Sequence, residues 1–122
     1  MFLRTLVFSS LLVLAGTQAV LAQTRLVMVE EKGCIWCARW NQEIADIYPK
    51  TGEGKAAPLQ RMDIHAPRLE GLSFKRALHY TPTFVLMVDG AEVSRIEGYP
   101  GEDFFWGLLQ QMLADANIAI LE

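Results

Sequence analysis

Both cysteines of the chain lie in one short stretch, Glu-Lys-Gly-Cys-Ile-Trp-Cys-Ala-Arg-Trp, at residues 31–40. Only Ile35 and Trp36 separate Cys34 from Cys37. A disulfide between them would close a very small loop, and such a loop removes little entropy from the unfolded chain. The spacing therefore favours a pair that opens and closes over a permanent crosslink. Thiol–disulfide exchange needs such a pair, because one thiolate attacks and a second thiol releases the mixed disulfide.

A helical pattern begins at this pair and suggests different roles for the two sulfurs. Cys37, Trp40 and Ile44 fall on one face of the predicted helix, so Trp40 is expected in the core. Cys34 would lie at the first turn, where unpaired backbone N–H groups and the helix dipole stabilise an anion. Cysteines at helix starts have pKa values lowered from about 8.5 to roughly 3.5–7.5. We therefore predict Cys34 as the nucleophile and the deeper Cys37 as the resolving thiol.

The elements that must position this pair follow from apolar spacing and turn residues. The order is strand, helix, strand, helix, strand, strand, helix, and its first half favours a right-handed parallel crossover. The dipeptide Asp89-Gly90 is a strong hairpin signal. Strands are expected at residues 25–30, 59–64, 84–88 and 93–97, helices at 34–48 (ended by Pro49), 69–80 and 102–117, and a loop at 50–57.

Over nearly all of residues 23–122 the chain resembles a thioredoxin-fold protein. Three features carry the resemblance: Cys34-Ile35-Trp36-Cys37 between a strand and a helix, Thr81-Pro82-Thr83 before an apolar strand, and a hairpin followed by glycine and a helix. The resemblance implies an α/β, three-layer fold in which helices flank a central mixed sheet of about four strands. In its small size it is similar to the short periplasmic thioredoxins of bacterial sulfur-oxidation (Sox) systems.

The same resemblance implies further site residues. It implies a cis peptide between Thr81 and Pro82 that lies against the cysteines, with Thr81 and Pro82 in contact with an extended substrate segment. Trp36 either joins this contact surface or packs over the helix start. The chain departs from the family at Met28, where thioredoxins commonly carry a buried Asp beneath the resolving cysteine. Because Met cannot accept a proton, we predict slow resolution by Cys37 unless Glu30 or a water chain substitutes.

The N-terminal segment has the pattern of a cleaved secretory signal. Arg4 precedes an apolar run from Leu6 to Ala15, and Val20-Leu21-Ala22 offers small or short residues for a signal peptidase. The run is shorter than the roughly 20 residues that a membrane span needs. We expect residues 1–22 to be removed, leaving a domain of residues 23–122 in the periplasm without stable membrane insertion; an uncleaved anchor is the alternative.

Charge and composition narrow the partners. The chain carries 11 basic and 14 acidic residues, a formal net charge of −3, so it offers no general attraction to nucleic acid. Cys34, Cys37, His65 and His79 match the ligand count of a structural zinc site, but the histidines are far apart in sequence. Because of this wide spacing we expect no metal, and we expect no other cofactor. A non-catalytic zinc- or copper-binding module is the alternative.

These observations together predict a thiol–disulfide oxidoreductase that acts on another protein. Its small size and the lack of an inserted helical domain favour a reductant, and a dithiol oxidase or isomerase on the same fold is the alternative. A periplasmic reductant needs electrons, which implies a membrane thiol transporter as supplier. The Sox-type resemblance implies a sulfur-carrier protein, with a cysteine that needs reactivation, as the substrate.

Overall fold

A computed structural model of the chain describes Gly16 and residues 23–122, so the predicted signal peptide lies outside the described residues apart from Gly16. In this part of the chain, no helix is both long and apolar enough to cross a membrane. The elements in chain order are β1 (Thr24–Glu30), α1 (Ile35–Trp40), a π-helix (Asn41–Ala45), a 3₁₀ turn (Tyr48–Lys50), α2 (Gly52–Ala56), β2 (Leu59–Asp63), β3 (Thr83–Val88), β4 (Ala91–Glu97) and α3 (Glu102–Asp115).

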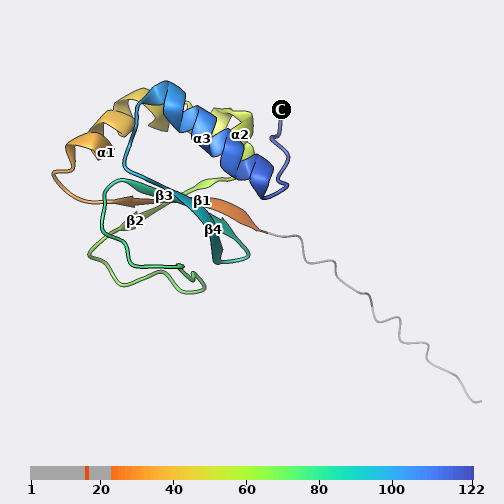
Figure 1. Cartoon of the computed structure of the whole chain (residues 1–122), viewed down its shortest axis with the longest axis horizontal. Helices are drawn as coiled ribbons and strands as arrows, with labels where there is room; N and C mark the ends of the chain where they lie inside the picture. Colours follow the sequence, from red (N-terminus) through yellow and green to blue (C-terminus); the bar gives the residue numbers. More distant parts are fainter. Residues whose placement is uncertain (1–15, 17–22) are drawn as a thin grey trace, which may run out of the picture.

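A four-stranded mixed sheet forms the centre of the domain, with the strand order β2-β1-β3-β4. Strands β1 and β2 run parallel, as expected for a crossover through α1, whereas β3 is antiparallel to both β1 and β4. All three α-helices lie on one face of the sheet, and the green segment between β2 and β3 runs below the other face (Figure 1). The predicted α/β fold with a mixed sheet of about four strands is confirmed.

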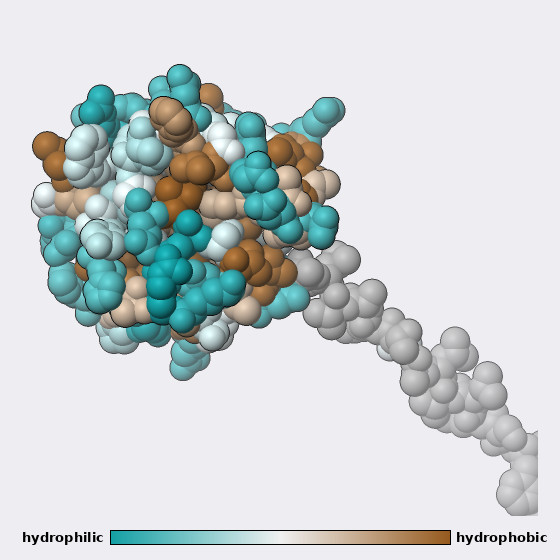
Figure 2. Space-filling view, in the orientation of Figure 1, coloured by the Kyte–Doolittle hydropathy of each residue, from teal (hydrophilic) through white to brown (hydrophobic). Residues whose placement is uncertain are grey.

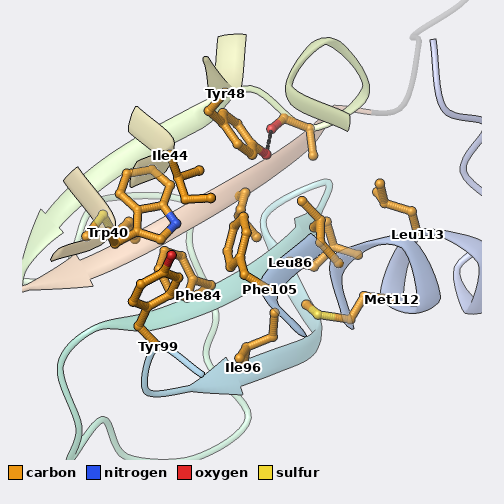
Figure 3. Packing of buried hydrophobic residues seen from close by; sticks show 14 of the residues in the cluster. Trp40, Ile44, Tyr48, Phe84, Leu86, Ile96, Tyr99, Phe105, Met112 and Leu113 are labelled. Atoms are coloured by element: carbon orange, nitrogen blue, oxygen red, sulfur yellow. Dashed lines mark hydrogen bonds between the residues drawn. The ribbon is translucent and has the colours of Figure 1, made fainter. Parts of the chain in front are cut away.

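Aromatic side chains fill the core between the sheet and the helices. Trp40 is fully buried, and its ring centroid lies 5.3 Å from that of Phe84 and 5.8 Å from that of Phe105 (Figure 3). Tyr48 lies in the same cluster and donates its hydroxyl to the Ala57 carbonyl oxygen at 2.6 Å. The predicted core position of Trp40 is confirmed, and α1 is fixed on the sheet through it.

The opposite face of the sheet is covered without a helix, so the prediction of a helix at residues 69–80 is wrong. The segment instead pairs with the β3–β4 hairpin: Ser73 N–H donates to the Gly90 carbonyl at 2.7 Å, and Glu92 N–H donates to the Ser73 carbonyl at 2.9 Å. Its apolar side chains still pack on the sheet, as their spacing suggested. They are Leu69, Leu72, Phe74 and Leu78.

Two smaller predictions are also corrected. Residues 50–57, expected as a loop, contain α2, because the Thr51 hydroxyl accepts the Gly54 N–H at 3.0 Å and caps the helix. The helix expected at residues 34–48 becomes a π-helix at Asn41, and Pro49 lies inside the following 3₁₀ turn. The hairpin at Asp89–Gly90 is confirmed, with φ of 51° and 80° at these two residues.

Candidate active site

Cys34 and Cys37 form a disulfide at the start of α1, with their Cα atoms 5.2 Å apart. Gly33 makes the turn out of β1 with φ of 79°, a conformation that favours glycine. Cys34 is the N-cap of α1, and its Sγ accepts the Cys37 N–H at 3.1 Å. A backbone N–H aimed at this sulfur favours a negative charge there, because hydrogen bonds to the ionised form of a group stabilise that form.

The two sulfurs differ in their access to solvent. Cys37 is 4% exposed and packs in the core cluster with Met28 and Trp40, whereas Cys34 is only partly buried. The two residues between the cysteines are open to solvent, with Ile35 75% and Trp36 50% exposed. Apolar side chains also reach the surface, among polar ones, at the end of the molecule where α1 begins (Figure 2). An incoming disulfide can therefore reach Cys34 before Cys37.

The proline loop shares a surface hollow with Trp36, which lies between the two cysteines in sequence. The Thr81–Pro82 peptide bond is cis, as the resemblance implied, and the Pro82 carbonyl accepts the Gly98 N–H at 2.7 Å. A surface hollow of about 470 Å³ is lined by Trp36 on one side and by Tyr80 and Thr81 on the other. The structure thus brings Trp36 and Thr81 together at one surface, while Pro82 itself is buried.

Met28, on β1 beneath the helix, is fully buried and shares the core cluster with Cys37. Glu30, two residues further along β1, pairs with Arg61 at 2.7 Å. Arg61 also donates to Asn41 Oδ1 at 2.8 Å and approaches Met28 Sδ at 3.6 Å. The nearby carboxylate is therefore held by a guanidinium, and Met28 offers no oxygen to take a proton.

The two histidines have different neighbours. His65 Nε2 lies 2.6 Å from Glu31 Oε1, and this hydrogen bond raises the pKa of His65 above its ordinary value. His79 is exposed and lines the same hollow as Trp36. Among the described residues, no three His, Cys, Asp or Glu side chains gather in a way that could hold a metal ion.

The contacts among Arg39, Glu43 and Tyr99 next to Trp36 were not predicted from the sequence. The Arg39 guanidinium carbon lies 5.6 Å from the Trp36 ring centroid, and Arg39 Nε lies 2.9 Å from Glu43 Oε1. The Tyr99 hydroxyl donates to Glu43 Oε2 at 2.6 Å. The four-residue spacing of Arg39 and Glu43 is a local signal for their pairing. Tyr99, distant in sequence, gives no such signal.

The chain is similar to a protein of known structure. No family model matches the chain, and no curated protein sequence matches it. Among solved structures, the chain is similar to the periplasmic thioredoxin SoxS from Paracoccus pantotrophus, in its reduced form, with 51% sequence identity and a TM-score of 0.76. The match covers 77% of this chain and 99% of that one.

Proposed function

The chain belongs to the thioredoxin family and is a thiol–disulfide oxidoreductase. We propose that it is exported to the periplasm and that it reduces disulfides or mixed disulfides on a partner protein. In this proposal Cys34 attacks, Cys37 resolves, and Trp36, Thr81 and Pro82 form the surrounding contact surface. The observation that carries it is the Cys34–Cys37 disulfide at the start of α1, with one sulfur accessible and the other buried.

The proposed reaction balances within the two proteins. The reduced form begins with a Cys34 thiolate, which attacks one sulfur of the partner's disulfide; that S–S bond breaks, and the leaving thiolate takes up a proton. Cys37 then loses its proton and attacks Cys34 Sγ; the mixed disulfide bond breaks, and the second partner sulfur leaves as a thiolate that takes up a proton. Two electrons have passed to the partner, and the Cys34–Cys37 disulfide has formed.

The oxidised pair needs two electrons and one proton to return to the Cys34 thiolate and the Cys37 thiol. We propose that the dithiol of a membrane thiol transporter returns them, because an exported reductant needs an electron source outside the cytoplasm. The related SoxS structure is a reduced form, whereas Cys34 and Cys37 of this chain are joined by a disulfide. The same fold is therefore compatible with both ends of this cycle.

The proposed location and the proposed substrate are supported by different observations. The proposal of export rests on the signal pattern of residues 1–22 and on the periplasmic location of the related SoxS. If it is correct, the protein recovered from the periplasm of an expressing bacterium begins at Gln23. For the substrate, we propose a sulfur-carrier protein whose reactive cysteine needs reactivation.

Trapping the partner tests the central proposal. Cys37→Ser removes the resolving thiol, so the variant should hold its partner as a mixed disulfide on Cys34 that mass spectrometry identifies. Cys34→Ser is the matched control, because it keeps one thiol but loses the accessible one, and it should trap nothing. A Cys37→Ser variant that captures no more protein than Cys34→Ser would refute the assignment of roles.

The direction of the reaction is tested by the reduction potential. A value near that of thioredoxin, about −270 mV, supports a reductant, whereas a value near about −120 mV indicates a dithiol oxidase. Insulin reduction separates both from the metal-binding alternative. Purified protein that retains stoichiometric zinc or copper and fails to reduce insulin would support a metal-binding module instead.

A further inference from the structure

The Trp36 side chain lines two surface hollows. The larger hollow, about 470 Å³, reaches Tyr80 and Thr81, and the smaller one, about 280 Å³, reaches Arg39 and Pro100. Trp36 is the residue common to both. Half of its surface is exposed, so the shape offered to a docking protein at this point depends on where the indole is held.

A continuous set of contacts connects this indole to the core. Arg39 lies over the Trp36 ring at 5.6 Å, Glu43 binds Arg39 through Oε1 at 2.9 Å, and Tyr99 binds Glu43 through Oε2 at 2.6 Å. Both carboxylate oxygens of Glu43 are therefore in use, each with a different partner. The exposed end of the set is an indole, and the other end is a buried tyrosine.

Tyr99 provides a fixed end because it is 7% exposed and packs against Phe105, with ring centroids 6.2 Å apart. Its neighbour Gly98 holds the Pro82 carbonyl, so the same short segment also contacts the proline loop. The hydrogen bond from Tyr99, followed by that from Arg39, lowers the pKa of Glu43, and burial raises the pKa of Tyr99. At neutral pH the acceptor is thus ionised and the donor keeps its proton.

We propose that Glu43 is a positioning residue that, through Arg39, fixes the Trp36 indole as a wall against which the protein substrate docks. This inference rests on the proposed function, because it assigns a role within the surface around Cys34. Glu43 does not touch the sulfurs in this assignment. It acts on the affinity for a protein substrate and leaves the reactivity of Cys34 unchanged.

An isolated ion pair on the surface would be too weak to hold Arg39 in place, because such pairs contribute little to stability. The pairing here differs in its geometry, since the carboxylate is held from one side by a tyrosine that the core immobilises. Holding an aromatic side chain in its bound position before the substrate arrives reduces the entropy lost on binding. The expected benefit is therefore in substrate affinity, with little effect on the stability of the fold.

Two substitutions test the assignment independently. Tyr99→Phe removes only the hydroxyl that holds Glu43, and Glu43→Gln removes the charge that holds Arg39. Both should raise KM for insulin about two- to tenfold, as expected for one side chain that must be ordered on binding. The rate at which Cys34 reduces dithiodipyridine, a small disulfide that needs no docking surface, should stay at the wild-type value.

A third measurement asks whether Glu43 acts through Trp36. In a Trp36→Ala background, Glu43→Gln should have no further effect on KM, since the side chain to be positioned is gone. Gln111→Ala is the control, because Gln111 makes a similar exposed contact with Asp115 on α3 away from the site. It should leave KM for insulin unchanged.

The outcomes separate clearly. An undiminished effect of Glu43→Gln without Trp36, an equal loss of dithiodipyridine reactivity, or an unchanged KM in both single variants would each overturn the assignment. Failure of the proposed function gives a different result, because the wild-type protein would then fail to reduce insulin at all, as Cys34→Ser is expected to.

Discussion

The pair formed by Glu92 and Arg95 on β4 should be the most sensitive charged contact in the described part of the chain. The exposed fractions of their side chains are 1% and 3%, and the two side chains make two short hydrogen bonds, at 2.6 and 2.7 Å. Glu92 Oε1 also accepts the Lys75 N–H at 3.0 Å, and Arg95 donates to the Arg76 and Ala77 carbonyls at 3.1 Å each. The pair therefore ties β4 to the irregular segment that leads to the proline loop.

Glu92→Gln tests this pair with little change in volume. The new amide can still accept the Lys75 N–H, but its NH₂ group faces the Arg95 guanidinium and leaves a buried positive charge without its main partner. Breaking a buried ion pair in this way costs about 3–5 kcal/mol. Glu97, whose carboxylate lies 3.6 Å from Arg95, remains as a partial counter-charge. We therefore expect a loss of about 3 kcal/mol in the free energy of unfolding, at the lower end of that range.

Urea unfolding of the oxidised protein at neutral pH measures this loss. With an m-value of about 1–3 kcal/mol/M for a domain of this size, the midpoint should fall by roughly 1–3 M. The matched control is Arg76→Ala, which removes an exposed pair with Glu97 whose side chains are 60% and 33% exposed. Such a pair contributes about 0.2–1 kcal/mol, so the control should shift the midpoint far less.

A double-mutant cycle gives the result that would refute the reasoning. Arg95→Met alone should also be costly, because it leaves the Glu92 carboxylate buried and unpaired. The double variant removes both charges, so its cost should be below the sum of the single costs by at least about 1 kcal/mol. Additive costs, or a Glu92→Gln cost no larger than that of Arg76→Ala, would show that the buried pair does not hold the segment.

Three further predictions concern acid, the core beneath Cys37, and the helical glycines. Burial alone would raise the pKa of Glu92, but its hydrogen bonds from Arg95 and the Lys75 N–H outweigh burial and lower the pKa below the ordinary 4.5. The contribution of ionised Glu92 to the free energy of unfolding should therefore be fully present above that pH and decline as the pH falls below it. The urea midpoint of Glu92→Gln should show a weaker decline over the same pH range. Because Met28 cannot accept the Cys37 proton, the mixed disulfide should outlast that of an ordinary thioredoxin, and Met28→Asp should shorten its lifetime in a quenched alkylation assay. Gly107→Ala fills open space on α3 and should raise the free energy of unfolding by about 0.4–1 kcal/mol. Gly54→Ala should lower the free energy of unfolding, because the new Cβ would clash with the Tyr48 carbonyl oxygen. Equal urea midpoints for the two variants would contradict this prediction.

The strands were predictable because their signals are local. Apolar residues 84–88 follow the Thr81–Pro82 step, and Asp89-Gly90 supplies the two residues with positive φ that a tight hairpin needs. The cysteine pair was predictable for the same reason, since Cys34 and Cys37 are close in sequence. Trp36 and Thr81 were named from a resemblance, and the structure places both at one hollow.

The prediction of a helix at residues 69–80 failed because of contacts between residues distant in sequence. Leu69, Leu72 and Phe74 have spacing that suits a helix, and they are packed against the sheet, but the backbone is drawn to the hairpin edge by Gly90 and Glu92. The spacing of apolar residues within 69–80 contains no information about hydrogen bonds to Gly90 and Glu92. The contact between Tyr99 and Glu43 was missed for the same reason, because its two ends are 56 residues apart.

The absent helix also explains why an arginine is needed inside the domain. In a helix ending at Tyr80, the Arg76 carbonyl would accept the Tyr80 N–H, whereas the Ala77 carbonyl would lie in the last turn without an intrahelical partner. In the irregular segment both accept from Arg95 instead, while the same guanidinium holds Glu92. A lysine has three donors on one nitrogen and cannot reach these separate acceptors in the same way. Arg95 therefore supplies, from β4, hydrogen bonds to the backbone of the irregular segment that leads to Thr81.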